Sequence, residues 1–285
     1  MAGDADETTV SAVVNPPAGP SGEQRRWNDP YWTSVWPKRE RLTSSVTPYL
    51  LEHLAPRPGE KVLDIGPGAG LASLEVALRL GDSGLLVGAD ISEPLIELAR
   101  RRASESGAGN VRFVLADMQS ATPEGGPFDA ASSQFGVMFF DEPTEAFANI
   151  RSLCRPDARL AFVCWQEMSR NPWFVGPAVA PFLPPPPPPA AGRSPTGPFA
   201  FADPAYVTEM LRGAGWSDIG HHPYEVVATV MPDSILDEGQ LRFQGVPADR
   251  EAEAWDASMA YLRPLWREDG RYGAPLAFQV FTARN

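Results

Sequence analysis

Cysteine and histidine are scarce in this chain of 285 residues, which has two cysteines and three histidines. Two cysteines exclude a disulfide framework, and a zinc site would need more ligands at closer spacing. Cys154 and Cys164 both lie in apolar stretches, so we expect free, buried thiols in a reducing compartment. We predict no metal site.

Long hydrophobic runs and an excess of basic residues are also absent. With 24 Lys and Arg against 36 Asp and Glu, the formal net charge is −12. This charge argues against binding to nucleic acids and to anionic membrane surfaces, both of which need clustered basic side chains. No apolar run approaches the ~18 residues of a membrane span, and the acidic N-terminus does not resemble a signal peptide. We therefore expect a cytoplasmic protein that acts on a small molecule.

A glycine-rich turn is the most informative feature that is present. The stretch VLDIGPGAG covers residues 62–70 and reads as a buried strand that enters a tight turn before a helix. Its spacing is G-x-G-x-G, whereas dinucleotide-binding proteins have G-x-G-x-x-G. The turn alone leaves the ligand open. Its glycines are Gly66, Gly68 and Gly70, and Asp64 precedes them.

Strands and helices alternate from Lys61 onward. The predicted strands begin at Lys61 and continue at residues 84–90, 111–117, 128–140 and 159–165, with helices at 71–80, 93–107 and 142–154 between them. This alternation predicts a doubly wound α/β domain with a parallel sheet, in which ligands bind beyond the carboxyl ends of the strands.

Each of the first three predicted strands carries a carboxylate at its carboxyl end. Asp90 is placed to accept hydrogens from the ribose hydroxyls of an adenosine, and Asp117 from the adenine amino group, with Met118 and Ile91 against the two ring faces. Asp64 would repel a pyrophosphate but suits a ligand that carries an ammonium and a sulfonium. Each aspartate alone could instead cap a helix or a turn, but three together predict S-adenosylmethionine.

The chain from about Trp27 onward resembles the class I S-adenosylmethionine-dependent methyltransferases, and in particular the bacterial small-molecule enzymes related to the ubiquinone/menaquinone type. The stretches DIGPGAG, ADI and ADM match the family's loop, ribose acid and adenine contact. The resemblance implies a Rossmann-like sheet of seven strands whose last strand, within residues 275–285, is antiparallel. One departure is Asp157-Ala158, where relatives usually carry Gly-Gly. Further candidate cofactor residues are Pro67, Gln134 and Phe135.

Five segments are expected along the chain. They are a disordered tail (1–24), an aromatic and helical lid (25–58), the cofactor-binding core (59–166), a proline-rich insertion (167–203), and the rest of the core with a helical cap (204–285). The prolines at 184–189 are expected to be a stiff spacer, although such a run could also dock a partner protein.

Aromatic residues flank the predicted core and are expected to wall the acceptor site. Tyr31, Trp32 and Trp36 precede the core, and Trp165, Trp173 and Phe174 follow the fifth strand. Related enzymes use such segments as lids, and aromatic rings can also attract a sulfonium. The alternative is that these rings only pack on one another.

No general base is evident in the sequence. The candidates are Asp141, which could instead cap the next helix, and His221 and His222, of which at most one could face a pocket from a strand.

We expect methyl transfer to the oxygen, nitrogen or carbon of a small molecule, for instance in specialised metabolism, by a monomer or homodimer. The alternatives are a non-methylating reaction on the same fold and a non-catalytic interaction protein.

Overall fold

The computed structural model describes residues 22–184 and 196–285. Most of the predicted N-terminal tail, and Pro185–Pro189 of the proline run, lie outside the described residues.

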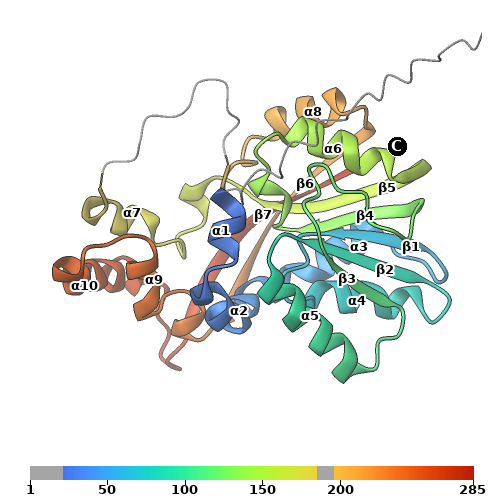
Figure 1. The fold of residues 1–285 in the computed structure, drawn as a ribbon. Coiled ribbons are helices and arrows are strands. Elements are labelled where there is room, and N and C mark those ends of the chain that lie inside the picture. The colour runs from blue at the N-terminus through green and yellow to red at the C-terminus, as the bar shows by residue number, and fades with distance from the viewer. Residues whose placement is uncertain (1–21, 185–195) are drawn as a thin grey trace, which may run out of the picture.

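A single sheet of seven strands forms the centre of the molecule (Figure 1). Its strand order is β3-β2-β1-β4-β5-β7-β6, and β7 is antiparallel to both neighbours, β5 and β6, whereas the first five strands are parallel. The predicted seven-stranded fold with an antiparallel last strand is therefore confirmed. The strands are β1 (Lys61–Ile65), β2 (Leu85–Asp90), β3 (Val111–Leu115), β4 (Phe128–Gln134), β5 (Cys154–Trp165), β6 (Ser217–Val230) and β7 (Tyr272–Arg284).

Helices cover both faces of the sheet. In Figure 1, α6 (Pro143–Ser152) and α8 (Pro204–Gly213) lie over one face, and α3 (Thr47–Leu54), α4 (Leu71–Leu80) and α5 (Glu93–Ser106) lie over the other. The strand residues between these layers are almost wholly buried, as in β4 and β5. This burial on both faces explains their nearly continuous apolar sequences.

The aromatic N-terminal segment is helical from Gly22 onward. It forms α1 (Gly22–Trp27) and α2 (Pro30–Thr43), so residues 22–24, predicted to belong to the tail, lie in a helix. The Asp29 carboxylate caps α2 by accepting the Tyr31 backbone N–H at 2.8 Å, and Pro30 occupies the first turn. Pro37 lies inside α2.

The fourth strand is shorter than predicted. It ends at Gln134 because Phe135 has a φ of +64°, which is incompatible with a strand, and residues 137–139 form a short 3₁₀ turn. Asp141 does not cap α6. That helix begins at Pro143 after Glu142, and no side chain caps it.

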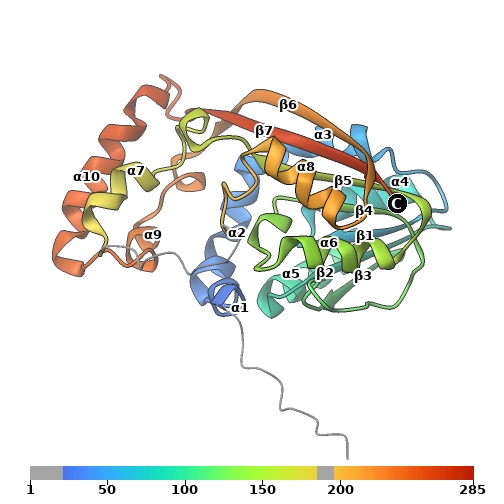
Figure 2. The same ribbon diagram turned by 90° about the horizontal axis from the view of Figure 1, so that it is seen from above.

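The strands β6 and β7 extend past the other strands toward a second group of helices (Figure 2). This group contains α7 (Gly176–Val179), α9 (Glu238–Phe243) and α10 (Glu251–Leu262). In Figure 2, α1 and α2 lie between this group and the sheet, and α2 contacts both α9 and β6.

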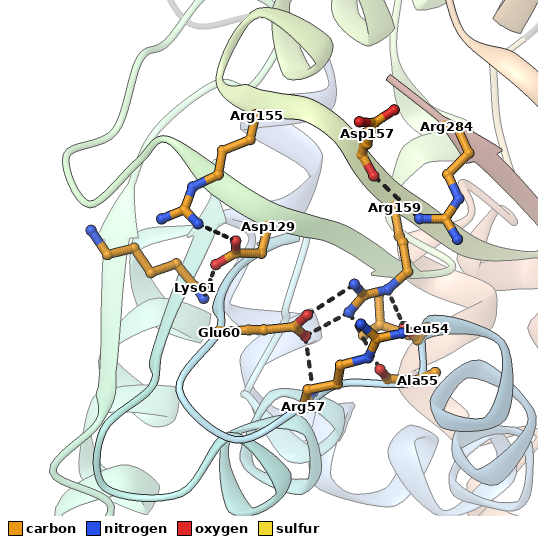
Figure 3. Close-up of polar contacts among 10 residues, drawn as sticks. All are labelled: Leu54, Ala55, Arg57, Glu60, Lys61, Asp129, Arg155, Asp157, Arg159 and Arg284. Carbon is orange, nitrogen blue, oxygen red and sulfur yellow. Dashed lines mark hydrogen bonds and ion pairs between the residues drawn. The ribbon is translucent and has the colours of Figure 1, made fainter.

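An ion pair lies at the amino end of β1 and joins it to β5 and α3 (Figure 3). The Arg159 guanidinium contacts both carboxylate oxygens of Glu60, at 2.9 and 2.5 Å, and donates to the Leu54 carbonyl at the end of α3. Burial acts to raise the pKa of Glu60, but its hydrogen bonds with Arg159 and Arg57 outweigh burial and lower it. This contact fixes the α3–β1 connection on the side of the sheet away from the carboxyl ends of the strands.

Cys154 and Cys164 are free and buried, as predicted. Burial raises the pKa of the Cys154 thiol to about 12, so it is unreactive near neutral pH. Among the described residues, no helix is both long and apolar enough to cross a membrane.

Candidate functional site

A cavity opens above the carboxyl ends of β1 to β4 and is covered by α1 and α2. It encloses about 1110 Å³, including space that is open to solvent at its mouth. Asp64 near the end of β1, Asp90 at the end of β2 and Asp117 just after β3 all line it, together with the glycine loop and the turn after β4. The predicted convergence of these residues at one edge of the sheet is therefore what the structure shows.

The glycine loop lies against other parts of the protein. Gly68 has a φ of +56°, and a Cβ atom there would come within 2.8 Å of the Trp36 indole ring from α2. Gly70, at φ +82°, meets Phe113 at the same distance and does not line the cavity. A side chain at either position would therefore be strained by its backbone and displace an aromatic ring. Gly66 and Pro67 both line the cavity.

Asp64 is buried at the base of the loop, with 3% of its surface exposed. Its two carboxylate oxygens accept hydrogen bonds from the hydroxyls of Ser73 on α4, at 2.5 Å, and Ser132 on β4, at 3.1 Å. Burial raises the pKa of Asp64 to about 6, although the two serines act to lower it. A positive charge near this carboxylate would favour its ionised form.

Asp90 connects the loop to the start of α5. Its carboxylate accepts the backbone N–H of Gly68 at 3.0 Å and that of Ser92 at 2.9 Å. Burial raises the pKa of this carboxyl group, and these backbone hydrogen bonds act against the rise. A carboxylate oxygen has more than one acceptor site, so Asp90 can also accept hydrogens from a ligand in the cavity.

Asp117 and Met118 line the next part of the cavity, after β3. Asp117 is exposed and accepts the backbone N–H of Gln119 at 3.0 Å, while Met118 is buried. Ile91 lines the cavity from the β2–α5 turn, and its carbonyl accepts a hydrogen bond from Asn28 at 3.1 Å. These positions suit the predicted contacts to an adenine ring.

The turn after β4 supplies an aromatic wall. Phe135 lines the cavity with its strained backbone, and its ring stacks on Trp165 with 4.0 Å between centroids. The Gln134 amide donates to the Thr43 carbonyl at 3.4 Å, while its buried Oε1 atom has no hydrogen-bond partner among the described residues. Such an atom is expected to receive a donor from a ligand or a water.

The predicted lid aromatics occupy different places. Only Trp36 lines the cavity, where it packs edge-on against Trp27 at 5.7 Å. Tyr31 and Trp32 instead pack against Phe243 of α9. Trp165 and Trp173 contact each other at 4.9 Å behind Phe135 and do not line the cavity, and Phe174 packs on Trp173.

The two candidate histidines do not lie at the cavity. On β6, His221 hydrogen bonds to Gln279 at 2.7 Å, while the His222 ring lies 4.2 Å from that of His53. Asp141 does line the cavity. Of the three candidate bases, the structure therefore brings only Asp141 to the site.

Several lining residues were not predicted from the sequence. Glu40 follows Trp36 by four residues on α2, and this helical spacing could have identified it. No sequence pattern indicated that Glu23 would line the cavity, and residues 1–24 were expected to form a disordered tail. Burial raises the pKa of Glu23, which Asp141 also raises, while Arg26 and Trp27 act to lower it. Other lining residues that were not predicted include Trp27, Thr43, Gln119, Phe139 and Phe140.

Comparison with known proteins finds methyltransferases. Residues 62–157 match the model of a methyltransferase domain. The chain is 30% identical over 178 residues to nocamycin O-methyltransferase of Saccharothrix syringae, covering 60% of this chain and 64% of that protein.

Two further curated relatives match shorter stretches. The chain is 31% identical over 136 residues to aklanonic acid methyltransferase DauC of Streptomyces sp. (strain C5), covering 48% of this chain and 58% of that protein. It is 32% identical over 113 residues to the ubiquinone/menaquinone biosynthesis C-methyltransferase UbiE of Azotobacter vinelandii, covering 39% and 45%. The chain thus matches less than two thirds of the length of these curated relatives.

Solved structures share the fold. The [4+2]-cyclase SpnF matches with a TM-score of 0.52 and 21% identity, over 85% of this chain and 80% of that one.

Proposed function

Because the chain belongs to the class I S-adenosylmethionine-dependent methyltransferases, with its methyltransferase domain at residues 62–157, we propose that it transfers a methyl group from S-adenosylmethionine to a small molecule. The observation that carries the proposal is the convergence of Asp64, Asp90 and Asp117 with the glycine loop in one cavity.

The residues present fit this cofactor. Asp90, Ile91, Asp117 and Met118 all line the cavity. We propose that Asp90 binds the ribose hydroxyls and that Asp117 binds the amino group of an adenine ring that lies between Ile91 and Met118. The unpaired Gln134 Oε1 offers an acceptor for a further donor, such as an ammonium. When bound, S-adenosylmethionine supplies a methyl group activated by its sulfonium.

The protein's own contribution is to enclose and orient the reactants. Trp27, Trp36 and Phe139 pack on one another and form an aromatic cover over part of the cavity. Holding an acceptor in line with an activated carbon can lower the barrier by ~7–11 kcal/mol in favourable cases. Asp141 and Glu23, at the same cavity, are the carboxylates that could take a proton from the acceptor.

The lining also limits the acceptor. Six carboxylate side chains line the cavity, and Lys, Arg and His are absent from the lining among residues 22–184 and 196–285. Three of these carboxylates are assigned to the cofactor and Glu40 pairs with Arg102, which leaves Glu23 and Asp141 for the acceptor. We therefore propose a neutral or cationic acceptor with an apolar or flat body. The names of the nocamycin and aklanonic acid enzymes support a small-molecule acceptor.

The decisive experiment measures S-adenosylhomocysteine as a product. Candidate acceptors are incubated with the protein and S-adenosylmethionine, and Asp90→Ala serves as the control. Product formed by the wild type and not by the variant supports methyl transfer. The fold alone does not separate methylation from other reactions, since the cyclase SpnF shares it. Conversion of an acceptor without S-adenosylhomocysteine would favour such a non-methylating reaction.

The setting in which the protein works is also a proposal. We propose that it acts in the cytoplasm as a monomer or homodimer and does not bind nucleic acid. The net charge of −12 supports the last point. Size-exclusion chromatography with light scattering would establish the oligomeric state.

A further inference from the structure

Helix α2 rests directly on the glycine loop through two side chains one turn apart. Trp36 packs on Gly68, where an added Cβ atom would lie 2.8 Å from the indole. Glu40, four residues later on the same helix, reaches the loop through Arg102 of α5. The helix that covers the cavity and the loop that forms its floor are thus joined at adjacent residues.

Arg102 bridges α2 and the loop with one nitrogen atom. Its Nη1 lies 2.7 and 2.9 Å from the two Glu40 oxygens and donates to the Ala69 carbonyl at 3.0 Å. Glu40 is buried, with 8% of its surface exposed. Burial raises the pKa of Glu40, and Arg102 acts to lower it. A buried carboxylate of this kind depends strongly on its single cationic partner.

We propose that the Glu40–Arg102 pair is a positioning device that holds α2 closed on the glycine loop and thereby sets the affinity for the cofactor. Neither residue needs to touch the transferred methyl group. Arg102 binds the Ala69 carbonyl and so holds the loop in place. By holding Glu40, it also keeps Trp36, one turn earlier on α2, packed on Gly68 in the cavity. This inference rests on the proposed function, because it assumes that the cavity holds S-adenosylmethionine.

A second ion pair on the same helix provides a matched control. Arg39, next to Glu40 in sequence, contacts Asp237 at 2.8 Å and so joins α2 to the start of α9. Neither of these residues lines the cavity, and both are largely buried. Loss of this pair removes an ion pair from α2 without touching the glycine loop.

The test measures the Kd for S-adenosylhomocysteine by calorimetry and the hydrogen exchange of the α2 amides. We expect Arg102→Met to weaken binding at least tenfold and to speed exchange in α2. Arg102→Lys, which keeps a cation, should bind within about threefold of the wild type, as should the control Arg39→Met. Wild-type affinity and wild-type α2 exchange in Arg102→Met would overturn the proposal, as would an equal loss in Arg39→Met.

Two further measurements keep the outcome clear. If Arg102→Met does not fold, the double variant Glu40→Gln/Arg102→Met removes both charges and leaves no unpaired one. It should show the same tenfold loss, and wild-type affinity in the folded double variant would refute the pair's role. If the wild type itself does not bind S-adenosylhomocysteine, the proposed function fails, and α2 exchange in the variants still decides whether the pair holds the helix.

Discussion

Replacing Asp64 with Asn should remove a pH dependence from cofactor binding. The ordinary pKa of an aspartate is 3.8, whereas burial raises that of Asp64 to about 6. Between these values the ligand-free protein holds a proton on Asp64 that the unfolded chain does not. The stability that this proton confers is present at low pH and is lost as the pH rises through 6.

The magnitude follows from this shift. A rise of about two in the pKa corresponds to a free-energy difference of roughly 3 kcal/mol between the two protonation states. As the pH rises from 4 to 7, the unfolding free energy of the wild type should therefore decrease by up to that amount relative to the unfolding free energy of Asp64→Asn. A cationic ligand that restores the ordinary pKa would bind about tenfold more tightly at pH 7 than at pH 5, because at pH 5 about ten of every eleven free molecules carry the proton.

The assay is calorimetric titration with S-adenosylmethionine at pH 5, 6 and 7, for the wild type and for Asp64→Asn. Asn removes the ionisation and keeps one oxygen acceptor, while its NH2 group replaces the other oxygen, so one of the two serine hydroxyls must accept instead of donate. Carboxylates with raised pKa values that do not interact with Asp64, such as Glu40, are present in both proteins and cancel in the comparison. The same pH dependence in both proteins would refute a role for Asp64 in binding a cationic ligand.

Three further predictions concern the site, one turn and the N-terminal helices. Asp90→Ala should weaken cofactor binding ~100-fold or more, because it removes a charged hydrogen-bond acceptor. Asp117→Ala should lose only ~0.5–1.5 kcal/mol of binding free energy. Equal losses of the two variants in calorimetry would contradict this assignment. Asp157→Gly should raise the unfolding free energy by ~1 kcal/mol in denaturant titrations, because Asp157 has a φ of +63°, and unchanged stability would count against strain there. Deleting residues 1–36 should abolish turnover and weaken cofactor binding relative to a chain that starts at residue 22, and full activity would rule out a lid.

The convergence of the three aspartates could be predicted because parallel strands place their carboxyl ends at one edge of a sheet. Asp64, Asp90 and Asp117 needed only the correct strands, and each predicted strand is present at its place in the chain. Whether they bind the cofactor remains a prediction.

The cover of the cavity could be predicted only in part. The Asp29-Pro30 pair is a helix-start signal that would have placed α2 correctly. Glu23 offered no signal, because its place at the cavity depends on the docking of a six-residue helix. The early end of β4 likewise depends on the left-handed backbone of Phe135, which a phenylalanine adopts only when its surroundings, here the stacked Trp165, hold it.

The contact between α2 and α9 has a consequence for the design of chimeric proteins. Arg39 binds Asp237, and the Tyr31 ring stacks on Phe243 at 4.9 Å, so two segments about 200 residues apart in the sequence pack as one unit. A chimera that exchanged the N-terminal helices alone would separate these partners. Recombination between homologous enzymes should therefore move residues 22–54 and 231–265 together, and leave the contiguous cofactor half in place.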